Sequence, residues 1–457
     1  MRLSLLEDAA YKFRIPKAKM GWRTGLDRTT TKLLGSICKT SKTPRPVELG
    51  ETDPNSFVIS FCGTGTGHFT QALACIGMLQ SHGLVLSGVI TDTTASQKIL
   101  DEMIAPLGVK TLVLPTVEII DDKRGMAPAH KILAAATRLD RMIDQTAEET
   151  RQFFRTAKPA LLLNFYQVSL ARFLQFNPLP TSVRVFHMAP QFGLTGLPLH
   201  EMHSPIEVIN RAFMGVMRQA FAASAPCLAI SANDDDGALA PIIELPSRLP
   251  RGGTSAGAGD GRGEADGTKV VEAPPPPLLL CYFLVQRDGA RLERLLAKRP
   301  LPEGVEVHCF TKEALPPHKS GRPLSLHSHA KQRKLFQQLF ARCTGVICSS
   351  GNETIWEAVC RGVPVLTIPS KGNGEQMLNA VAHATNHPLL VRHRPKLRGD
   401  DVHWLATFAQ TEATRQESEA LRSRVSSLMD GGPGALESHL SKVGVARQPT
   451  PVQDLGA

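Results

Sequence analysis

Short apolar runs alternate along the chain with longer stretches in which apolar residues recur at every third or fourth position. The runs predict buried strands and the stretches predict helices, so the pattern is typical of parallel α/β sheets. In the first half we expect a strand starting at Phe57, further strands over residues 86–90, 111–115, 159–165 and 183–188, and helices over residues 127–157 and 206–221.

The same alternation returns after a change in composition. Residues 247–277 are rich in glycine and end in a run of prolines, which indicates a flexible linker. Beyond it we expect a polar loop over residues 315–328, strands over residues 278–284, 305–310, 346–348 and 365–368, and helices over residues 290–298, 331–342 and 401–429 and from Glu353 and Glu375 onward.

The length and the pattern together predict two Rossmann-like, doubly wound α/β domains that face each other across a cleft. A chain of 457 residues with 42% hydrophobic content can bury two ordinary cores. We place the domains, with their flanking segments, in this order: a basic disordered tail at 1–56, an acceptor-side domain at 57–246, a linker at 247–277, a nucleotide-sugar domain at 278–398, a C-terminal helix at 399–430 and a disordered tail at 431–457.

Charge and cysteine content narrow the possible partners. The net charge is +10, and about half of it lies before Phe57, where eleven basic residues meet six acidic ones. We expect this segment to be an organelle transit sequence, an arm that contacts anionic lipid, or a leader without a targeting signal.

The aromatic and cysteine contents narrow the choice further. With 5% aromatic residues there is no stacking platform for nucleic acid. Nine scattered cysteines without a C-x-x-C pair favour a reducing compartment, so we expect a cytoplasmic protein without a membrane span, free or membrane-associated.

The stretch of residues 345–379 carries the clearest chemistry. A strand leads through Ser350 and Gly351 into a helix, and the free N–H groups of a helix N-terminus favour an anion such as a diphosphate. Glu357 lies about one turn into that helix, where a carboxylate accepts hydrogen bonds from ribose hydroxyls. Glu375 and Gln376 open the next helix at the same sheet edge and suit sugar hydroxyls.

This stretch closely resembles the donor-binding half of the GT-B-type inverting nucleotide-sugar glycosyltransferases. The group is family 28, which includes the bacterial cell-wall N-acetylglucosaminyltransferase and the plant galactolipid synthases. The shared pattern is Ser350-Gly351, Thr354, Glu357-Ala358, Gly362, Pro364, Pro369, Glu375-Gln376 and Asn379-Ala380. The resemblance implies that Ser350, Gly351 and Thr354 lie at the diphosphate side, that Glu357 binds the ribose, and that Glu375 and Gln376 read the sugar.

A second match lies about 280 residues upstream, in a glycine loop. Gly63, Gly65, Gly67 and His68 follow the first strand as G-x-G-x-G-H. The loop lacks the Gly-Lys-Ser/Thr of a P-loop, and its spacing departs from the dinucleotide fingerprint, although Asp92 stands near the place of that fingerprint's acid. The loop, together with Gln71, resembles the first loop of the same glycosyltransferases, where it lies across the cleft from the nucleotide.

The catalytic base is less defined than the donor site. The resemblance implies that His68 either deprotonates the acceptor hydroxyl or bonds to the donor diphosphate, and an imidazole suits a general base at neutral pH. Related proteins carry an acid at the end of the strand over residues 159–165, and this chain has Asn164 there. An amide cannot take a proton, which moves the assignment toward His68.

No metal site is expected from the sequence. Asp234, Asp235 and Asp236 lie in a turn-rich segment without the strand that a D-x-D metal motif uses. Three histidines, one glutamine and one glutamate gather near the loop after residue 188, but their spacing matches no known metal site; they are His187, Gln191, His200, Glu201 and His203.

The expected function is therefore a metal-independent, inverting glycosyltransferase that moves a hexose or N-acetylhexosamine from a UDP-sugar to an acceptor hydroxyl. The UDP-sugar is a co-substrate, and no cofactor is expected. The expected acceptor is a lipid or a small molecule. If the acceptor is a lipid, we expect the protein to contact a membrane peripherally. Two alternatives stay open: a nucleotide-sugar epimerase of the same fold, and a non-catalytic subunit that binds nucleotide-sugar.

Overall fold

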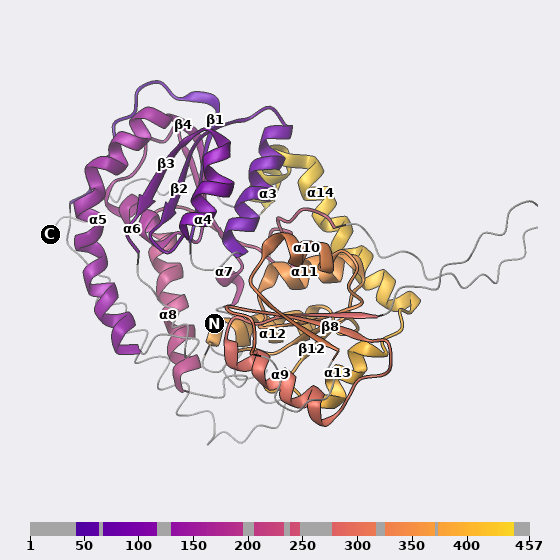
Figure 1. Cartoon of the computed structure of the whole chain (residues 1–457). Coiled ribbons are helices and arrows are strands. Elements are labelled where there is room, and N and C mark those ends of the chain that lie inside the picture. The colour runs from indigo at the N-terminus through magenta and orange to yellow at the C-terminus, as the bar shows by residue number, and fades with distance from the viewer. Residues whose placement is uncertain are drawn as a thin grey trace, which may run out of the picture.

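The structure is a computed structural model of the chain, shown in Figure 1. It describes residues 43–63, 67–116, 129–194, 205–232, 238–246, 277–316, 325–370 and 373–442. Within these residues the chain forms two α/β domains, each built on a parallel sheet. No helix in this part of the chain combines the length and the apolar character needed to cross a membrane.

The first domain contains a six-stranded sheet in the order β3-β2-β1-β4-β5-β6. Its strands are rich in Val, Ile, Leu and Phe and most are buried, as expected where helices cover both faces of a parallel sheet. The strands are β1 (Asp53–Phe61), β2 (Val85–Asp92), β3 (Lys110–Leu114), β4 (Pro159–Phe165), β5 (Arg184–Ala189) and β6 (Cys227–Ala229), and the helices are α3 (Gly67–Ser81), α4 (Gln97–Ile99), η1 (Leu100–Ile104), η2 (Ala105–Leu107), α5 (Ala129–Ala157), α6 (Val168–Phe176), α7 (Gln191–Leu194) and α8 (Pro205–Ala222).

The second domain repeats this arrangement in the order β12-β11-β10-β7-β8-β9. Its strands are β7 (Leu278–Tyr282), β8 (Glu306–Thr311), β9 (Leu326–Ala330), β10 (Gly345–Cys348), β11 (Val365–Thr367) and β12 (Val391–His393), and its helices are α9 (Gln286–Lys298), α10 (Arg333–Phe340), α11 (Asn352–Arg361), α12 (Gly374–Asn386), α13 (Gly399–Ala406) and α14 (Glu412–Lys442).

Each sheet has one point at which the direction of its strand order reverses. In the first sheet the reversal lies between β1 and β4, and in the second it lies between β7 and β10. Doubly wound sheets bind ligands beyond the carboxyl ends of the strands at such a point. The loops after β1 and β10 are the two that the sequence pattern singles out, so the fold puts both at ligand-binding edges.

The two domains share one continuous apolar core. A single cluster of buried side chains includes Phe69 of α3, Ile355 of α11 and Val425 of α14. A smaller cluster joins Val208 and Met214 of α8 to α12. The domains are therefore in contact at two places, where side chains of helices from both domains pack together.

Helix α14 leaves the second domain and returns to the first, where it lies beside α3 (Figure 1). Arg424 on this helix donates to the carbonyl oxygens of Ser231, Ala232 and Ala238, which all belong to the first domain. His82 at the end of α3 contacts the carbonyl of Asp430 at 2.9 Å from Nε2. Polar contacts to backbone atoms thus fix α14 on the first domain.

Three strands differ from the expectations. Residues 326–328, expected at the end of a polar loop, begin β9 (Leu326–Ala330), the edge strand of the second sheet. The sequence LHSHA has no apolar run, because this edge strand packs only partly buried side chains. The short strands β6 and β12 were also not expected, since three residues give too little pattern.

The expected C-terminal helix over residues 401–429 is two helices, α13 and α14. The Gly-Gly-Pro-Gly segment interrupts the second of these helices as expected, because Gly432 has non-helical angles (φ 49°, ψ −132°), and a further helical segment, included in α14, then runs to Lys442. Gly432 accepts the positive φ, and Pro433 then suits the first turn of a new helical segment. The expectation of disorder is therefore wrong for residues 431–442, and residues 443–457 lie outside the described residues.

The N-terminal expectation also needs a correction. The strand β1 begins at Asp53, before Phe57, and Val47 is 1% exposed within the apolar core of the first domain. The N–H of Val47 donates to the carbonyl of Pro178 at 2.9 Å. Residues 43–56 thus belong to the first domain, and residues 1–42 lie outside the described part of the chain.

We expect Arg424→Met to lower the free energy of unfolding by about 2 kcal/mol, because three carbonyl acceptors lose a charged donor. The matched variant Arg415→Met removes from the same helix an exposed arginine whose guanidinium pairs with Glu412. It should change stability by less than about 0.5 kcal/mol. Urea unfolding of both variants is the measurement, and equal midpoints would contradict the role of Arg424.

Candidate functional site

A cavity of about 320 Å³ lies between the domains. This volume falls within the usual range of small-molecule sites. Both domains contribute to its lining, and the starts of α3 and α11, the helices that follow the two loops predicted from the sequence, meet there. The lining residues are Gly67, Phe69, Thr70, Ser96, Lys98, Ile99, Glu102 and Met103 from the first domain, and Tyr282, Phe310, Lys331, Gln332, Arg333, Phe336, Gln337, Glu353, Thr354 and Glu357 from the second.

The glycine loop is shaped by Asp92 at the end of β2. The Asp92 carboxylate accepts a hydrogen bond from the N–H of Gly63 at 3.1 Å, and it also accepts bonds from Thr94. A Cβ at Gly63 would stand 2.3 Å from the backbone nitrogen of Ala95, so this position requires glycine. Asp92 therefore holds the loop in place, which differs from the ribose role of the corresponding acid in dinucleotide folds.

Gly67 lets the two domains approach each other closely. A Cβ at this residue would lie 2.4 Å from the Glu353 carboxylate of the facing domain. Glu353 also accepts a hydrogen bond from the side-chain amide of Gln71. The helix starts of α3 and α11 are thus joined across the cleft by an amide and a carboxylate. Gly65, which the resemblance also places here, lies outside the described residues.

The loop after β10 delivers Ser350 and Gly351 to the start of α11. Ser350 has φ 65°, a left-handed conformation that is unusual for a residue with a side chain. Its side chain is fully buried, while Gly351 is exposed and a Cβ built there meets nothing within 4 Å. Open space therefore lies at the N-terminus of α11, where the first N–H groups of a helix favour an anion.

Glu357 lines the cavity one turn beyond Glu353. Burial, together with the nearby carboxylates of Glu353 and Glu244, raises the pKa of the Glu357 carboxyl to about 7, and Arg333 and Arg361 act against this rise. Burial also raises the pKa of Glu353. The carboxyl of Glu357 is consequently about half protonated at neutral pH. Thr354 is half-buried in the same wall of the cavity.

Glu375 and Gln376 form the first turn of α12, but they have different partners. The side-chain amide of Gln191, from α7, donates to Glu375 Oε1 at 2.8 Å and so forms a second bond between the domains. Gln376 Oε1 accepts the N–H of Ser370 at 2.8 Å, which closes the loop before α12. Burial raises the pKa of the Glu375 carboxyl, while the bond from Gln191 lowers it.

His68 lies at the start of α3, with its ring stacked on Tyr166 at 5.5 Å between centroids. Its Nε2 is 3.1 Å from the same Gln191 nitrogen that donates to Glu375. The two hydrogens of this amide serve one carboxylate and one imidazole, so Nε2 is the acceptor and Nδ1 carries the proton. Burial lowers the pKa of His68 to about 4, and the ring is neutral at physiological pH.

Asn164 does not point to a catalytic role. Its amide contacts His187 Nδ1 at 2.9 Å and the carbonyl of Gln167 at 3.1 Å, and its Oδ1 accepts the N–H of Gln167. His187 in turn contacts Ser224. These buried groups stabilise the turn after β4. Of the other grouped side chains, His200, Glu201, His203, Asp234, Asp235 and Asp236 lie outside the described residues.

Several residues that the fold brings to the cleft have no sequence pattern that predicts their contacts. Arg333 donates to the Met103 sulfur at 2.9 Å across the cleft, and it lies over the ring of Phe69. Lys331 lies over the ring of Tyr282. These residues precede the recognised stretch and belong to no short motif, so only the folded chain reveals them. Gln191 is similar, because its role depends on partners more than 120 residues away.

Two parallel α/β domains with facing ligand-binding edges define the GT-B fold of glycosyltransferases, and the chain has this fold. No protein-family model matches the sequence, and no curated protein matches it. Among solved structures, UGT89C1 of Arabidopsis thaliana in complex with quercetin has a TM-score of 0.56 at 14% identity, over 86% of this chain and 99% of that chain. The complex of the same protein with UDP has a TM-score of 0.55 at 15% identity, over 85% of this chain and 98% of that chain. CalG4, the calicheamicin glycosyltransferase, has a TM-score of 0.52 at 13% identity, over 85% of this chain and 98% of that chain.

We expect Glu353→Gln to lower the pKa of Glu357 below about 7, because a neighbouring negative charge is removed. Arg333→Gln should move the same pKa upward, since it removes a cation. The carboxyl carbon of Glu357 can be followed by NMR during a pH titration of selectively labelled protein. Shifts of the same sign in both variants would contradict this electrostatic description of the cavity.

Proposed function

We propose that the chain is a glycosyltransferase that moves a hexose or N-acetylhexosamine from a UDP-sugar to an acceptor hydroxyl, with inversion and without a metal. The observation that carries the proposal is that Gly67, from the glycine loop, and Thr354 and Glu357, from the donor pattern, line one cavity from opposite domains. The fold of UGT89C1, which has been solved with UDP and with UDP-L-rhamnose, supports a UDP-sugar donor.

The donor would bind mainly through the second domain. Its diphosphate lies at the N-terminus of α11 beside Gly351, where free N–H groups and the helix dipole offset the charge of the leaving group. Its ribose hydroxyls donate to Glu357. Lys331 and Arg333 add positive charge to this wall of the cavity. Helix ends and cations of this kind can stabilise the departing diphosphate in place of a metal ion.

The sugar would lie toward Glu375 at the start of α12. Its hydroxyls can donate to the Glu375 carboxylate, which now receives the amide of Gln191. Because the same amide also donates to His68, a sugar and an acceptor that enter together must displace Gln191 from both partners. Gln191 thus occupies the polar groups that the two substrates would use.

The proposed reaction is a direct displacement at the anomeric carbon. The acceptor oxygen forms a bond to that carbon from the face opposite the diphosphate, the bond from carbon to the phosphate oxygen breaks, and UDP leaves with the electron pair. The acceptor proton passes to Nε2 of His68, which is the unprotonated nitrogen of the neutral ring. With a pKa of about 4, the ring of His68 is unprotonated at every pH above about 5.

We expect UDP to bind about tenfold more weakly at pH 6 than at pH 8. The ribose hydroxyls donate to an ionised carboxylate, and a group with pKa about 7 is mostly protonated at pH 6 and mostly ionised at pH 8. Glu357→Gln should bind weakly at both pH values and lose the dependence. Glu412→Gln, at an exposed residue, is the control. Calorimetry that shows unchanged UDP affinity in Glu357→Gln would refute the ribose assignment.

We expect His68→Ala to lower turnover by about 100-fold or more, which is the usual contribution of a general base, with little change in UDP affinity. Release of UDP from UDP-glucose and from UDP-N-acetylglucosamine, with water as acceptor, provides the assay. In the wild type the acid limb of kcat should lie near pH 4, since burial lowers the pKa of His68. Equal losses of turnover and UDP affinity would count against a base, and a free sugar epimer among the products would favour an epimerase.

A further inference from the structure

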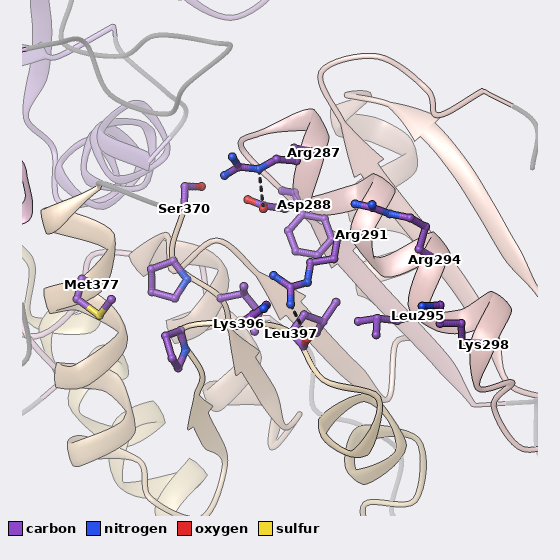
Figure 2. Close-up of a pocket in the computed structure, with 14 residues that line it drawn as sticks. Arg287, Asp288, Arg291, Arg294, Leu295, Lys298, Ser370, Met377, Lys396 and Leu397 are labelled. Atoms are coloured by element: carbon purple, nitrogen blue, oxygen red, sulfur yellow. Dashed lines mark hydrogen bonds and ion pairs between the residues drawn. The ribbon is translucent and has the colours of Figure 1, made fainter. Parts of the chain in front are cut away.

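A groove of about 770 Å³ lies in the second domain. The chain that leaves β7 separates it from the cavity between the domains. Tyr282 lines the cavity between the domains, and Phe283, the next residue, lines this groove. Helix α9 forms one wall, and the loops after β11 and β12 form the other (Figure 2). We call it the α9 groove.

Basic side chains dominate the α9 groove. Four of them repeat along one face of α9 at intervals of four, three and four residues, and a fifth comes from the facing loop; they are Arg287, Arg291, Arg294, Lys298 and Lys396. The helical spacing explains why they form a row. Among the described residues of the lining the only acid is Asp288, whose carboxylate lies 4.0 Å from Arg287.

Most of this positive charge is not neutralised by the protein. Within the described residues, Arg291, Arg294 and Lys298 have no carboxylate within 4 Å. Arg291 donates instead to the carbonyl of Leu397 at 3.4 Å. Burial lowers the pKa of Arg291, and although Asp288 raises it, the charges of Arg294 and Arg287 lower it further. Like charges held this close favour an anion between them.

The groove adjoins the sugar end of the proposed donor site. Ser370 and Met377 line it, and the N–H of Ser370 donates to Gln376, the residue that the sequence assigns to the sugar. The row from Arg287 to Lys298 covers about 16 Å along the helix, which is longer than one diphosphate. A donor whose diphosphate lies at Gly351 therefore leaves Arg294 and Lys298 unused.

We propose that the α9 groove is a second anion site, which binds phosphate groups other than those of the donor. The phosphate belongs either to the acceptor, held beside the sugar, or to a free anion that acts on the enzyme. That this anion site is separate from the donor diphosphate rests on the proposed function. That the site prefers phosphate rests on the side chains of the α9 groove alone. Arginine guanidinium groups in a row suit phosphate oxygens through paired N–H donors.

The test is the binding of inorganic pyrophosphate to full-length protein saturated with UDP, measured by calorimetry. The double variant Arg294→Glu/Lys298→Glu should bind pyrophosphate at least about tenfold more weakly than the wild type, and UDP equally well. Both side chains are exposed, so the fold should tolerate the change. The control Lys110→Glu/Arg415→Glu makes the same change in net charge at exposed residues far from the groove and should bind pyrophosphate as the wild type does.

Two results would overturn the proposal: no pyrophosphate binding to the UDP-loaded wild type, or equal weakening in both double variants. If UDP itself does not bind, the donor assignment fails, and pyrophosphate binding to the unloaded protein still tests the groove.

A second experiment distinguishes an acceptor phosphate from a free anion. It compares glycerol with glycerol 3-phosphate as acceptors of sugar from UDP-glucose and from UDP-N-acetylglucosamine. Use of the phosphate ester alone, with a raised KM in Arg294→Glu/Lys298→Glu, indicates an acceptor phosphate. Pyrophosphate that alters donor hydrolysis, with neither alcohol used, indicates a free anion.

Discussion

Two amide–carboxylate hydrogen bonds across the cleft are the interaction on which the site depends. Gln71 donates to Glu353 and Gln191 donates to Glu375, and each pair joins one domain to the other. An amide is neutral, so it bonds to a carboxylate without cancelling its charge. Burial between the domains then raises the pKa of both acids. The closed arrangement is held by bonds that hydroxyl groups of a substrate can replace one for one.

Such replaceable bonds are useful only if the domains keep their alignment when the bonds break. Helix α14 supplies this alignment, because Arg424 bonds to three carbonyls of the first domain and the apolar core runs through Val425 into both domains. These contacts lie away from the cavity and need no ligand. The parts that fix the domains are therefore separate from the parts that a substrate would displace.

The sequence predicts the sheets well because buried parallel strands are nearly continuous apolar runs, as in residues 159–165. It fails where that signal is weak. The edge strand β9 is half polar, and the helical segment after Gly432 packs Leu436 into the shared apolar core. The site follows the same rule. Both loops with a recognisable pattern were found, whereas Arg333 and Gln191 act through partners distant in sequence, which no local pattern records.

Burial shifts the acids and the histidine of the cleft in opposite directions, and both shifts remove charge at neutral pH. The pKa of Glu357 rises to about 7 and that of His68 falls to about 4. The histidine is then unprotonated, and its Nε2 accepts a hydrogen bond from the Gln191 amide. Glu357, in contrast, is only about half ionised near neutral pH, so the negative charge that it offers at the proposed ribose site increases as the pH rises, while Lys331 and Arg333 line the same cavity. One physical cause, the burial of these groups between two domains, thus sets the protonation state of both Glu357 and His68.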